Sequence, residues 1–441
     1  MHKYLPLFVL RPMSMLVAMA ATGSAMATNG MLMEGYGPIS SAMGGASQAL
    51  DHGNAAMAQN PATLTFMSEG ARLDLAFGFL GPKVSSSVPG MSVSSGGTSY
   101  MMPALGYTKR TGALVYGIGM FAQGGMGTEY EANTFLAMGS GQPVRSELGI
   151  GSVIVPIAYQ VSRDLSLGAT LDYMWSDLDL LMATSGAQLG GLVTGAGGNL
   201  AQALPALGGA PWARINFSDG DKFSGAAKAT GYGAKIGGTY RLGGDVVLGA
   251  SYRFKSRIDD MKTNSSSASV TAFGGFSDSG RITVLDFQMP SVLSVGASWQ
   301  MDAATLLVAD VKTIGWSDSM KSFRMRYDSA GMGGTVSFEL PQNWKDQTVV
   351  NLGIAWKAND ALTLRAGVNL ADNPVPDTTV NPLFPAIVKN HLTMGLGYRV
   401  SARSEANLAL TMAPNTTVNS GSGVAIEHAQ NNVQLMYSHR F

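Results

Sequence analysis

Histidine, serine and the acidic residues are the side chains that could support catalysis, but their spacing matches no catalytic motif. The chain has five histidines, and it contains neither a Gly-x-Ser-x-Gly turn nor a His-Glu-x-x-His pair. His391 falls on an inward position of an expected strand, and a hydrolase would need a serine beside it. The glycines from Gly231 to Gly238 precede no expected helix, so they do not form a nucleotide-binding loop. The sequence therefore favours a protein that is not an enzyme, with no metal and no cofactor.

Several charged residues stand at alternate positions of apolar stretches. Arg365 lies between two apolar residues, so its side chain points to the opposite face of an expected strand. Asp310 and Lys312 share this pattern, as do Arg253 and Lys255. Two interpretations are open. Such groups could hold the carboxylate head of a ligand, for which Arg365 is our candidate, or they could pair with one another and tie down a segment inside the protein.

The composition excludes several classes of protein. The 441 residues include 29 Lys and Arg against 29 Asp and Glu. A nucleic-acid-binding protein normally carries a basic excess, and this chain has none. Cysteine is absent, which excludes disulfide-stapled domains and zinc sites built on thiolates.

The first residues have the features of an export signal. Two short apolar stretches, 5–10 and 13–21, follow a weakly basic start and are separated by Arg11 and Pro12. The small residues of the Ala25-x-Ala27 pattern are typical of a signal-peptidase site. We therefore predict a signal peptide at 1–27. A membrane anchor is the alternative, and the short, interrupted apolar stretch counts against it.

Beyond this segment, apolar and polar residues alternate over long stretches, as in 165–175, 350–356, 362–370 and 392–400. Runs of about 10 to 14 residues suit tilted strands that cross a membrane. No later segment is apolar enough for a spanning helix. We therefore predict an all-β fold, a transmembrane antiparallel β-barrel of about 14 strands over 71–441, in the outer membrane of a Gram-negative cell.

The expected strands lie at 71–81, 98–109, 113–122, 147–161, 164–177, 223–240, 244–257, 280–301, 303–328, 340–357, 360–373, 388–401, 404–414 and 430–441. Short turns alternate with long loops, as in outer-membrane barrels. The long loops are expected at 82–97, 123–146, 178–222, 258–279, 329–339, 374–387 and 415–429. The last strand ends in Phe441, which resembles the signal that the outer-membrane assembly machinery recognises.

Residues 28–70 show no alternation and are rich in small side chains. The pattern predicts short helices at 38–50 and 54–59, the second ending before Pro61. Some forty residues are few for an independent core. We therefore predict an N-terminal helical hatch, or plug, inside the barrel lumen. A small periplasmic domain is the alternative.

Several short motifs occur in a fixed order along the chain. They are Gly35-Tyr36-Gly37, Met43-Gly44-Gly45-Ala46, Asn60-Pro61-Ala62, Asn343-Trp344-Lys345 and Asn373-Pro374-Val375-Pro376-Asp377. In these motifs the chain resembles FadL/TodX-type outer-membrane transporters. The resemblance implies a fourteen-stranded barrel with an N-terminal hatch, which imports long-chain fatty acids or aromatic hydrocarbons. It also implies capture of the substrate by extracellular loops and release through a gap at a kinked third strand.

The candidate ligand-binding residues fall into three groups. The loop 178–222 is apolar and nearly uncharged, so it could capture a hydrophobic ligand or merely cover the barrel mouth. The new N-terminus could reach a pocket as a flexible, methionine-rich gate, although methionine is common throughout the chain. Together with Arg365, the candidates are Met31, Leu32, Met33, Leu189, Leu192, Leu204 and Trp212.

The candidate gating residues lie on the third strand and in the hatch. Gly117 and Gly119 interrupt the third strand, where glycine marks a bend or a close approach. They could form the lateral opening, or they could lie under the hatch. We include Asn60, Pro61 and Ala62 in the gating set.

The sequence as a whole predicts passive uptake of hydrophobic compounds, either long-chain fatty acids or aromatic and aliphatic hydrocarbons. The expected partners are these small molecules, outer-membrane lipid and lipopolysaccharide, and the assembly machinery through Phe441. We expect a monomer that binds no nucleic acid. A surface adhesin or receptor and a general porin are the alternatives.

Overall fold

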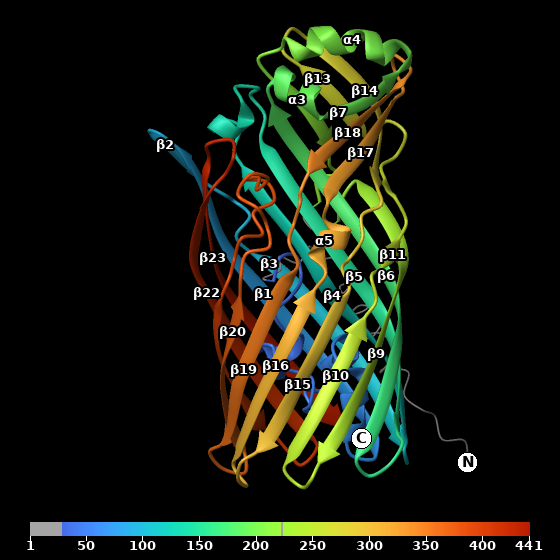
Figure 1. The fold of residues 1–441 in the computed structure, drawn as a ribbon, viewed down its shortest axis with the longest axis vertical. Helices are drawn as coiled ribbons and strands as arrows, with labels where there is room; N and C mark the ends of the chain where they lie inside the picture. Colours follow the sequence, from blue (N-terminus) through green and yellow to red (C-terminus); the bar gives the residue numbers. More distant parts are fainter. Residues whose placement is uncertain (1–28, 222–223) are drawn as a thin grey trace, which may run out of the picture.

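The computed structural model describes residues 29–221 and 224–441. The predicted signal peptide at 1–27 therefore lies outside the described residues. In these residues, 23 strands form one sheet in which every pairing is antiparallel, and the sheet closes where β1 meets β23 (Figure 1). No helix among the described residues is long and apolar enough to cross a membrane.

Eighteen strands form the closed circuit of the barrel. In the order of pairing they are β1 (Gly70–Val88), β3 (Tyr100–Thr111), β4 (Leu114–Tyr130), β5 (Val144–Gln160), β6 (Leu165–Thr184), β8 (Ala213–Phe217), β13 (Ala268–Ala272), β14 (Phe276–Leu285), β12 (Met261–Lys262), β9 (Ala227–Leu242), β10 (Val246–Arg253), β15 (Val292–Gln300), β16 (Thr305–Ile314), β19 (Gln347–Lys357), β20 (Leu362–Ala371), β21 (His391–Arg399), β22 (Ser404–Asn419) and β23 (Ala425–Arg440).

The other elements lie on the connections and inside the barrel. They are β2 (Met91–Ser94), β7 (Val193–Gly197), β11 (Arg257–Ile258), β17 (Ser322–Ser329), β18 (Thr335–Pro341), α2 (Gly37–Ser41), α3 (Gly186–Leu192), α4 (Gly198–Gly208), α5 (Trp316–Ser319), η1 (Ala55–Ala58), η2 (Pro61–Phe66) and η3 (Phe135–Ala137). We call the end of the barrel that carries α3 and α4 the upper end, and the end with the short turns the lower end (Figure 1).

The predicted number of about 14 strands is wrong. β8, β12 and β13 come from segments that the sequence indicated as the loops 178–222 and 258–279, and each has only two to five residues. Such short strands carry too little alternation to be recognised. In the lower part of the barrel β6 pairs directly with β9, from Leu165 to Leu178. Near the upper end these three strands and β14 lie between β6 and β9 and extend the sheet.

Three of the expected long strands are interrupted. The expected strand 280–301 divides into β14 and β15, because Asp286 has φ 54° and Pro290 follows. The expected strand 303–328 is divided by α5. The expected strand 340–357 divides into β18 and β19, where Asn343 has φ 51°. The segment 329–339, expected as a loop, is part of the β17–β18 hairpin.

Large apolar side chains cover the outside of the barrel. A row of aromatic side chains lies close to the short turns at the lower end. The strands of a membrane barrel meet the interface between membrane and water at such a level. The members of the row are exposed and are Tyr116, Tyr159, Tyr240, Trp299, Trp356 and Tyr398.

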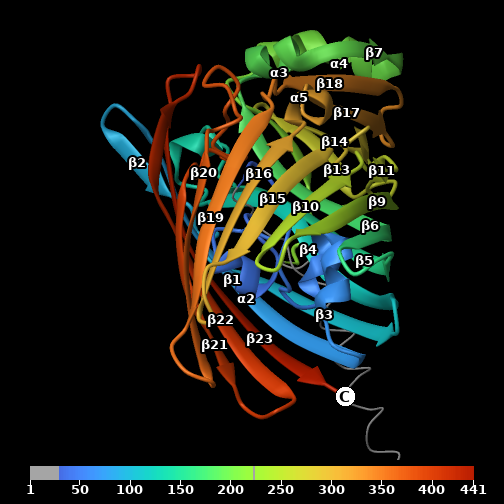
Figure 2. The same ribbon diagram turned by 60° about the horizontal axis from the view of Figure 1, so that its bottom comes forward.

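Residues 29–69, which we call the inner segment, lie inside the lower part of the barrel (Figure 2). Nearly all of them are buried. The helix α2 ends at Ser41, well before the expected residue 50, since Gly44 and Gly45 turn the chain with φ 70° and 87°. Glycine adopts this left-handed conformation without steric cost.

Charged residues of the wall hold the backbone of the inner segment. The Asp310 carboxylate accepts hydrogen bonds from the backbone N–H groups of Ser47 at 2.6 Å and Gln48 at 3.1 Å. The Lys312 ammonium donates to the carbonyl oxygens of Glu34 at 3.0 Å and Gly45 at 3.1 Å. Of the two interpretations of these inward charges, the geometry fits the one in which they tie down an interior segment.

The opposite side of the inner segment is held by β1 and β3. The Asp74 carboxylate accepts the N–H of Asn54 at 2.6 Å, and the Asn54 side chain donates to the carbonyl of Gly106 at 2.7 Å. Glycines of the wall allow this close approach, since a Cβ at any of them would collide with the inner segment. They are Gly106, Gly168, Gly237, Gly249, Gly353, Gly367 and Gly395.

We predict that Asp310→Ala lowers the stability of the folded barrel. The substitution leaves the buried N–H groups of Ser47 and Gln48 without their acceptor, which costs about 1–3 kcal/mol for each unsatisfied group. The measurement is the temperature at which the protein loses its heat-modifiable mobility on a gel. Asp360→Ala, at an exposed lower turn, is the matched control. Equal transition temperatures for the two variants would contradict this role of Asp310.

Candidate functional site

Cavities with an apolar lining form a series inside the barrel. The first, which we call the mouth cavity, lies at the upper end and encloses about 1430 Å³ of space, part of which is open to solvent. Leu136, Met182 and Leu192 line it together with residues of the segment 378–384. None of the described residues that line it is charged.

The second cavity, which we call the lumen cavity, lies deeper and has a volume of about 350 Å³. Leu340, Gln342 and Phe384 line both it and the mouth cavity, so these residues separate the two. The rings of Phe287 and Phe323 stand edge to face at 6.4 Å, and those of Phe323 and Phe384 lie 6.1 Å apart. Aromatic rings and methionines form a polarisable, adaptable lining. The remaining lining residues are Met31, Met126, Leu148, Leu178 and Met320, and none of the ten is charged.

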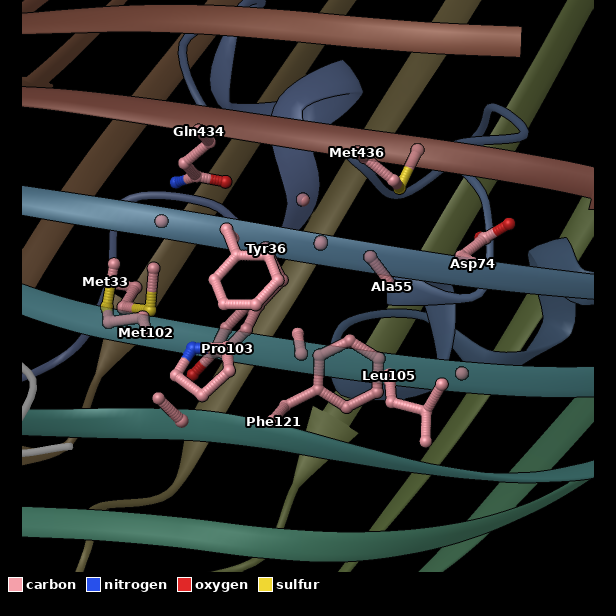
Figure 3. A pocket seen from close by; sticks show the side chains of 17 residues that line it. Met33, Tyr36, Ala55, Asp74, Met102, Pro103, Leu105, Phe121, Gln434 and Met436 are labelled. Atoms are coloured by element: carbon pink, nitrogen blue, oxygen red, sulfur yellow. The ribbon is translucent and has the colours of Figure 1, made fainter. Parts of the chain in front are cut away.

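The third cavity, which we call the wall cavity, has a volume of about 510 Å³ and lies between the inner segment and strands β1, β3 and β4. Figure 3 shows side chains of the inner segment and of the wall gathered around it, among them Met33, Tyr36, Met102 and Phe121. Its lining is apolar except for Asp74 and Gln434.

The wall is incomplete beside this cavity. The pairing of β3 with β4 ends at Leu105 and Met120, although β3 continues to Tyr100 and β4 continues to Tyr130. A bulge between Ala122 and Gly124 also shifts the register of β4 against β5. A β-bulge bends its strand and re-aims the neighbouring backbone. The backbone of β4 therefore needs partners other than β3 along this stretch.

The start of the inner segment supplies such partners. Leu32 forms a β-bridge with Gly124, and the N–H of Gly125 donates to the carbonyl of Met31 at 3.2 Å. The Tyr36 hydroxyl donates to the carbonyl of Gln123 at 3.0 Å. Burial raises the pKa of Tyr36, so this hydroxyl keeps the proton that it donates. Met31 lines the lumen cavity and Met33 lines the wall cavity, so this short stretch separates the two cavities.

The segment 372–390 connects β20 with β21 and folds into the barrel. Its carbonyl groups at Pro382 and Pro385 accept hydrogen bonds from Thr128 of β4 at 3.0 Å and from His428 of β23 at 2.8 Å, if the Nδ1 of His428 carries its proton. Ser146 of β5 bonds to the carbonyl of Leu383. These contacts fix the segment on β4, β5 and β23, and Phe384 lies between the mouth and lumen cavities.

The candidate residues of the loop 178–222 lie in different surroundings. Leu192 lines the mouth cavity, and Leu189 is a buried residue of α3. Leu204 is half-buried on α4, and Trp212 packs edge to face on Phe273 at 6.3 Å. Of this group, Leu192 is the residue that lines one of the three cavities described above.

The candidate gating residues also separate. Gly119 lies next to Met57 of the inner segment and to Phe121, at the edge of the wall cavity. Gly117 lies under β3, where the two strands still pair. At both positions neighbouring atoms approach the backbone of β4 closely, which explains why glycine occurs there.

Asn60, Pro61 and Ala62 lie against β6 and β9, away from the incomplete part of the wall. The Asn60 side chain caps η2 by accepting the N–H of Ala62 at 3.1 Å, and it donates to the carbonyl of Gly238 at 3.2 Å. A Cβ at Gly168 or Gly237 would collide with this motif. The motif anchors the inner segment at this place.

Arg365 lies at the lower end, outside the three apolar cavities. Its guanidinium donates to the Asn407 side chain at 2.9 Å and lies 3.8 Å from the Glu405 carboxylate. No three His, Asp or Glu side chains in 29–221 and 224–441 gather as a metal site would require.

Sequence analysis missed the aromatic residues of the lumen cavity. Phe287 and Phe384 stand on irregular segments, and Phe323 starts a strand that the alternation did not separate from its neighbour. The prolines 382 and 385 around Phe384 were the available signal, because two prolines so close exclude a regular element.

The chain matches a family model over residues 14–437, and that family is described as outer membrane protein transport protein (OMPP1/FadL/TodX). The structure resembles that of the toluene transporter TodX of Pseudomonas putida, with 31% identity and a TM-score of 0.83, over 92% of this chain and 99% of that one. The toluene transporter TbuX of Ralstonia pickettii has 30% identity and a TM-score of 0.79, over the same shares of the two chains.

The monoaromatic hydrocarbon channel CymD is 26% identical, with a TM-score of 0.76, over 94% of this chain and 99% of that one. No curated protein sequence matches the chain significantly. Because the family model covers nearly the whole sequence, the chain belongs to the OMPP1/FadL/TodX family of outer membrane transport proteins.

Proposed function

We propose that this outer-membrane transporter takes up neutral hydrophobic molecules, with monoaromatic hydrocarbons as the substrate class. One observation carries the proposal: the mouth, lumen and wall cavities form a series with an almost uncharged lining that ends at an incomplete part of the wall. The toluene transporters TodX and TbuX and the channel CymD, named above for their likeness, support the substrate class.

The lining favours a neutral substrate over a fatty acid. Among the described residues, no basic side chain lines the mouth or lumen cavity, so none would pair with a carboxylate moved into either of them. Burying an unpaired charge costs several kcal/mol even after the protein relaxes, on the order of the whole gain from burying several methylene groups. An aromatic hydrocarbon carries no such penalty, and the three phenylalanines of the lumen cavity offer it edge and face contacts.

The stretch Met31–Met33 acts as the gate in this proposal. It separates the lumen cavity from the wall cavity, and few backbone hydrogen bonds hold it on β4. The rest of the inner segment is held by Asp74, Asp310 and Lys312. A local displacement of the gate therefore joins the two cavities while the inner segment stays docked.

Release through the wall keeps the substrate out of water. Each methylene group exposed to water costs about 0.8 kcal/mol, so an aqueous exit would retain a greasy molecule inside the barrel. The unpaired stretch of β3 and β4 borders the wall cavity and gives a direct path to lipid.

A fatty acid is the second candidate substrate, because a more polar cavity of about 500 Å³ lies beside Met33. Lys235, Arg253 and Lys312 line it and could meet a carboxylate. Lys235 already pairs with Asp172, and Lys312 already binds carbonyl groups of the inner segment. Much of this positive charge is therefore occupied, which is why we place the neutral substrate first.

The proposal includes the biogenesis of the protein. We infer cleavage after residue 27, which would place the new N-terminus close to the gate at Met31. Phe441 is exposed at the end of β23, and its N–H donates to the carbonyl of Ala71 at 2.9 Å. This placement suits a closing strand that the assembly machinery recognises. For the oligomeric state, we still expect a monomer.

We predict that cells lacking their own channels gain saturable uptake of labelled toluene when they produce this protein, with little gain for oleate. Ala104→Trp should reduce toluene uptake at least about fivefold, since the new ring fills the wall cavity. Ala297→Trp, which adds the same ring on the outer face of β15, is the matched control. A greater gain for oleate than for toluene would reverse the order of the two substrates. Normal uptake by Ala104→Trp would exclude the wall cavity from the path.

We predict that Gly124→Val opens the gate. A Cβ at this position would collide with the Met31 carbonyl, so the gate can no longer lie on β4. Toluene uptake should rise severalfold, and planar-bilayer recordings should show a larger ion conductance. Gly244→Val, at a lower turn with open space around it, is the control. If Gly124→Val folds and neither uptake nor conductance increases, Met31–Met33 is not the gate.

A further inference from the structure

A fourth cavity of about 700 Å³ lies at the lower end of the barrel, between the inner segment and strands β1, β20, β21, β22 and β23. It shares no lining residue with the mouth, lumen or wall cavities, so it lies outside the proposed path. Five arginines line it, against the two carboxylates of Asp51 and Glu405. The arginines are Arg72, Arg365, Arg399, Arg403 and Arg440.

The two carboxylates do not balance this charge. Asp51 pairs with Arg72 at 2.8 Å, and Glu405 lies 3.8 Å from Arg365. The side chains of the other three arginines are exposed at the rim and donate to no described residue. The cavity therefore carries an excess of positive charge at its open side.

Two buried donors on residues that line the cavity also lack an acceptor. Among the described residues, the Nη2 of Arg72 and the Nδ2 of Asn407 have no hydrogen-bond partner, and these residues are 2% exposed each. Both atoms are hydrogen-bond donors only, so each of them needs an acceptor oxygen. A buried donor without an acceptor is costly, and the oxygen atoms of a bound anion would satisfy these two.

We propose that this cavity binds an oxyanion of the phosphate class. A phosphate offers several acceptor oxygens to guanidinium groups, whose planar forks match it well. The excess of arginine, the two unpartnered donors and the opening toward the lower end all agree with such a ligand. The source is either free phosphate or the phosphate head group of a lipid.

The bound oxyanion would join the inner segment to the wall. Asp51 and Gly53 belong to the inner segment, whereas the rim arginines belong to β21, to the turn before β22 and to β23. An anion between them would hold the inner segment at its lower side, opposite the gate.

Calorimetric titration of the full chain in a nonionic detergent tests the proposal. Sodium phosphate is compared with sodium chloride at equal ionic strength. Soluble dihexanoylphosphatidylglycerol is then compared with dihexanoylphosphatidylcholine. The test variant is Arg399→Gln with Arg440→Gln. The matched control is Arg163→Gln with Arg241→Gln, which removes two exposed arginines from other lower turns. Heat-modifiable gel mobility checks that each variant is folded.

We expect saturable binding that is at least about tenfold weaker in the test variant and unchanged in the control. Binding of inorganic phosphate would identify a free anion as the source. Binding of phosphatidylglycerol alone, with the same loss in the test variant, would identify a lipid head group. The proposal is overturned if neither ligand binds, or if the test variant binds as tightly as the control.

Discussion

The need to pair every backbone N–H and C=O group within lipid is the constraint on which the rest of the structure depends. A closed sheet satisfies it, but a closed sheet has no side exit. Here β3 and β4 part above Leu105, and the backbone of β4 would stand unpaired there. Met31, Leu32 and Tyr36 supply the missing partners. In the proposed mechanism the gate is therefore also a substitute strand, which pairs part of the free edge of β4 in the resting state.

This arrangement requires an inner segment that is fixed in one part and movable in another. Asp74, Asp310 and Lys312 fix it with short, buried, charge-assisted hydrogen bonds, which are stronger than neutral ones. Its first residues have only a few neutral contacts with β4. The free energy needed to move the gate is consequently far below that needed to remove the whole segment. The proposed gate and its anchor are therefore parts of one short segment of the chain.

The alternation of residues made the barrel and the inward direction of Asp310, Lys312 and Arg365 predictable, because both follow from the period of a strand. It could not give the strand count, since β12 has two residues and β8 and β13 have five each. Nor could it find Phe287 or Phe384, which reach the lumen on irregular segments folded in from the wall. Their positions depend on contacts with residues far away in the sequence, such as that between Thr128 and Pro382. Local patterns carry no information on such contacts.

The distribution of charge along the barrel separates two tasks. The mouth and lumen cavities have no charged lining residue, while the cavity at the lower end has seven. Charges beside an apolar path would hold water there and raise the free energy of a hydrocarbon in transit. Charges at the base meet no hydrocarbon if the substrate leaves through the wall above them. The proposed lateral exit would thus permit a strongly charged base, and that base is free to anchor the inner segment.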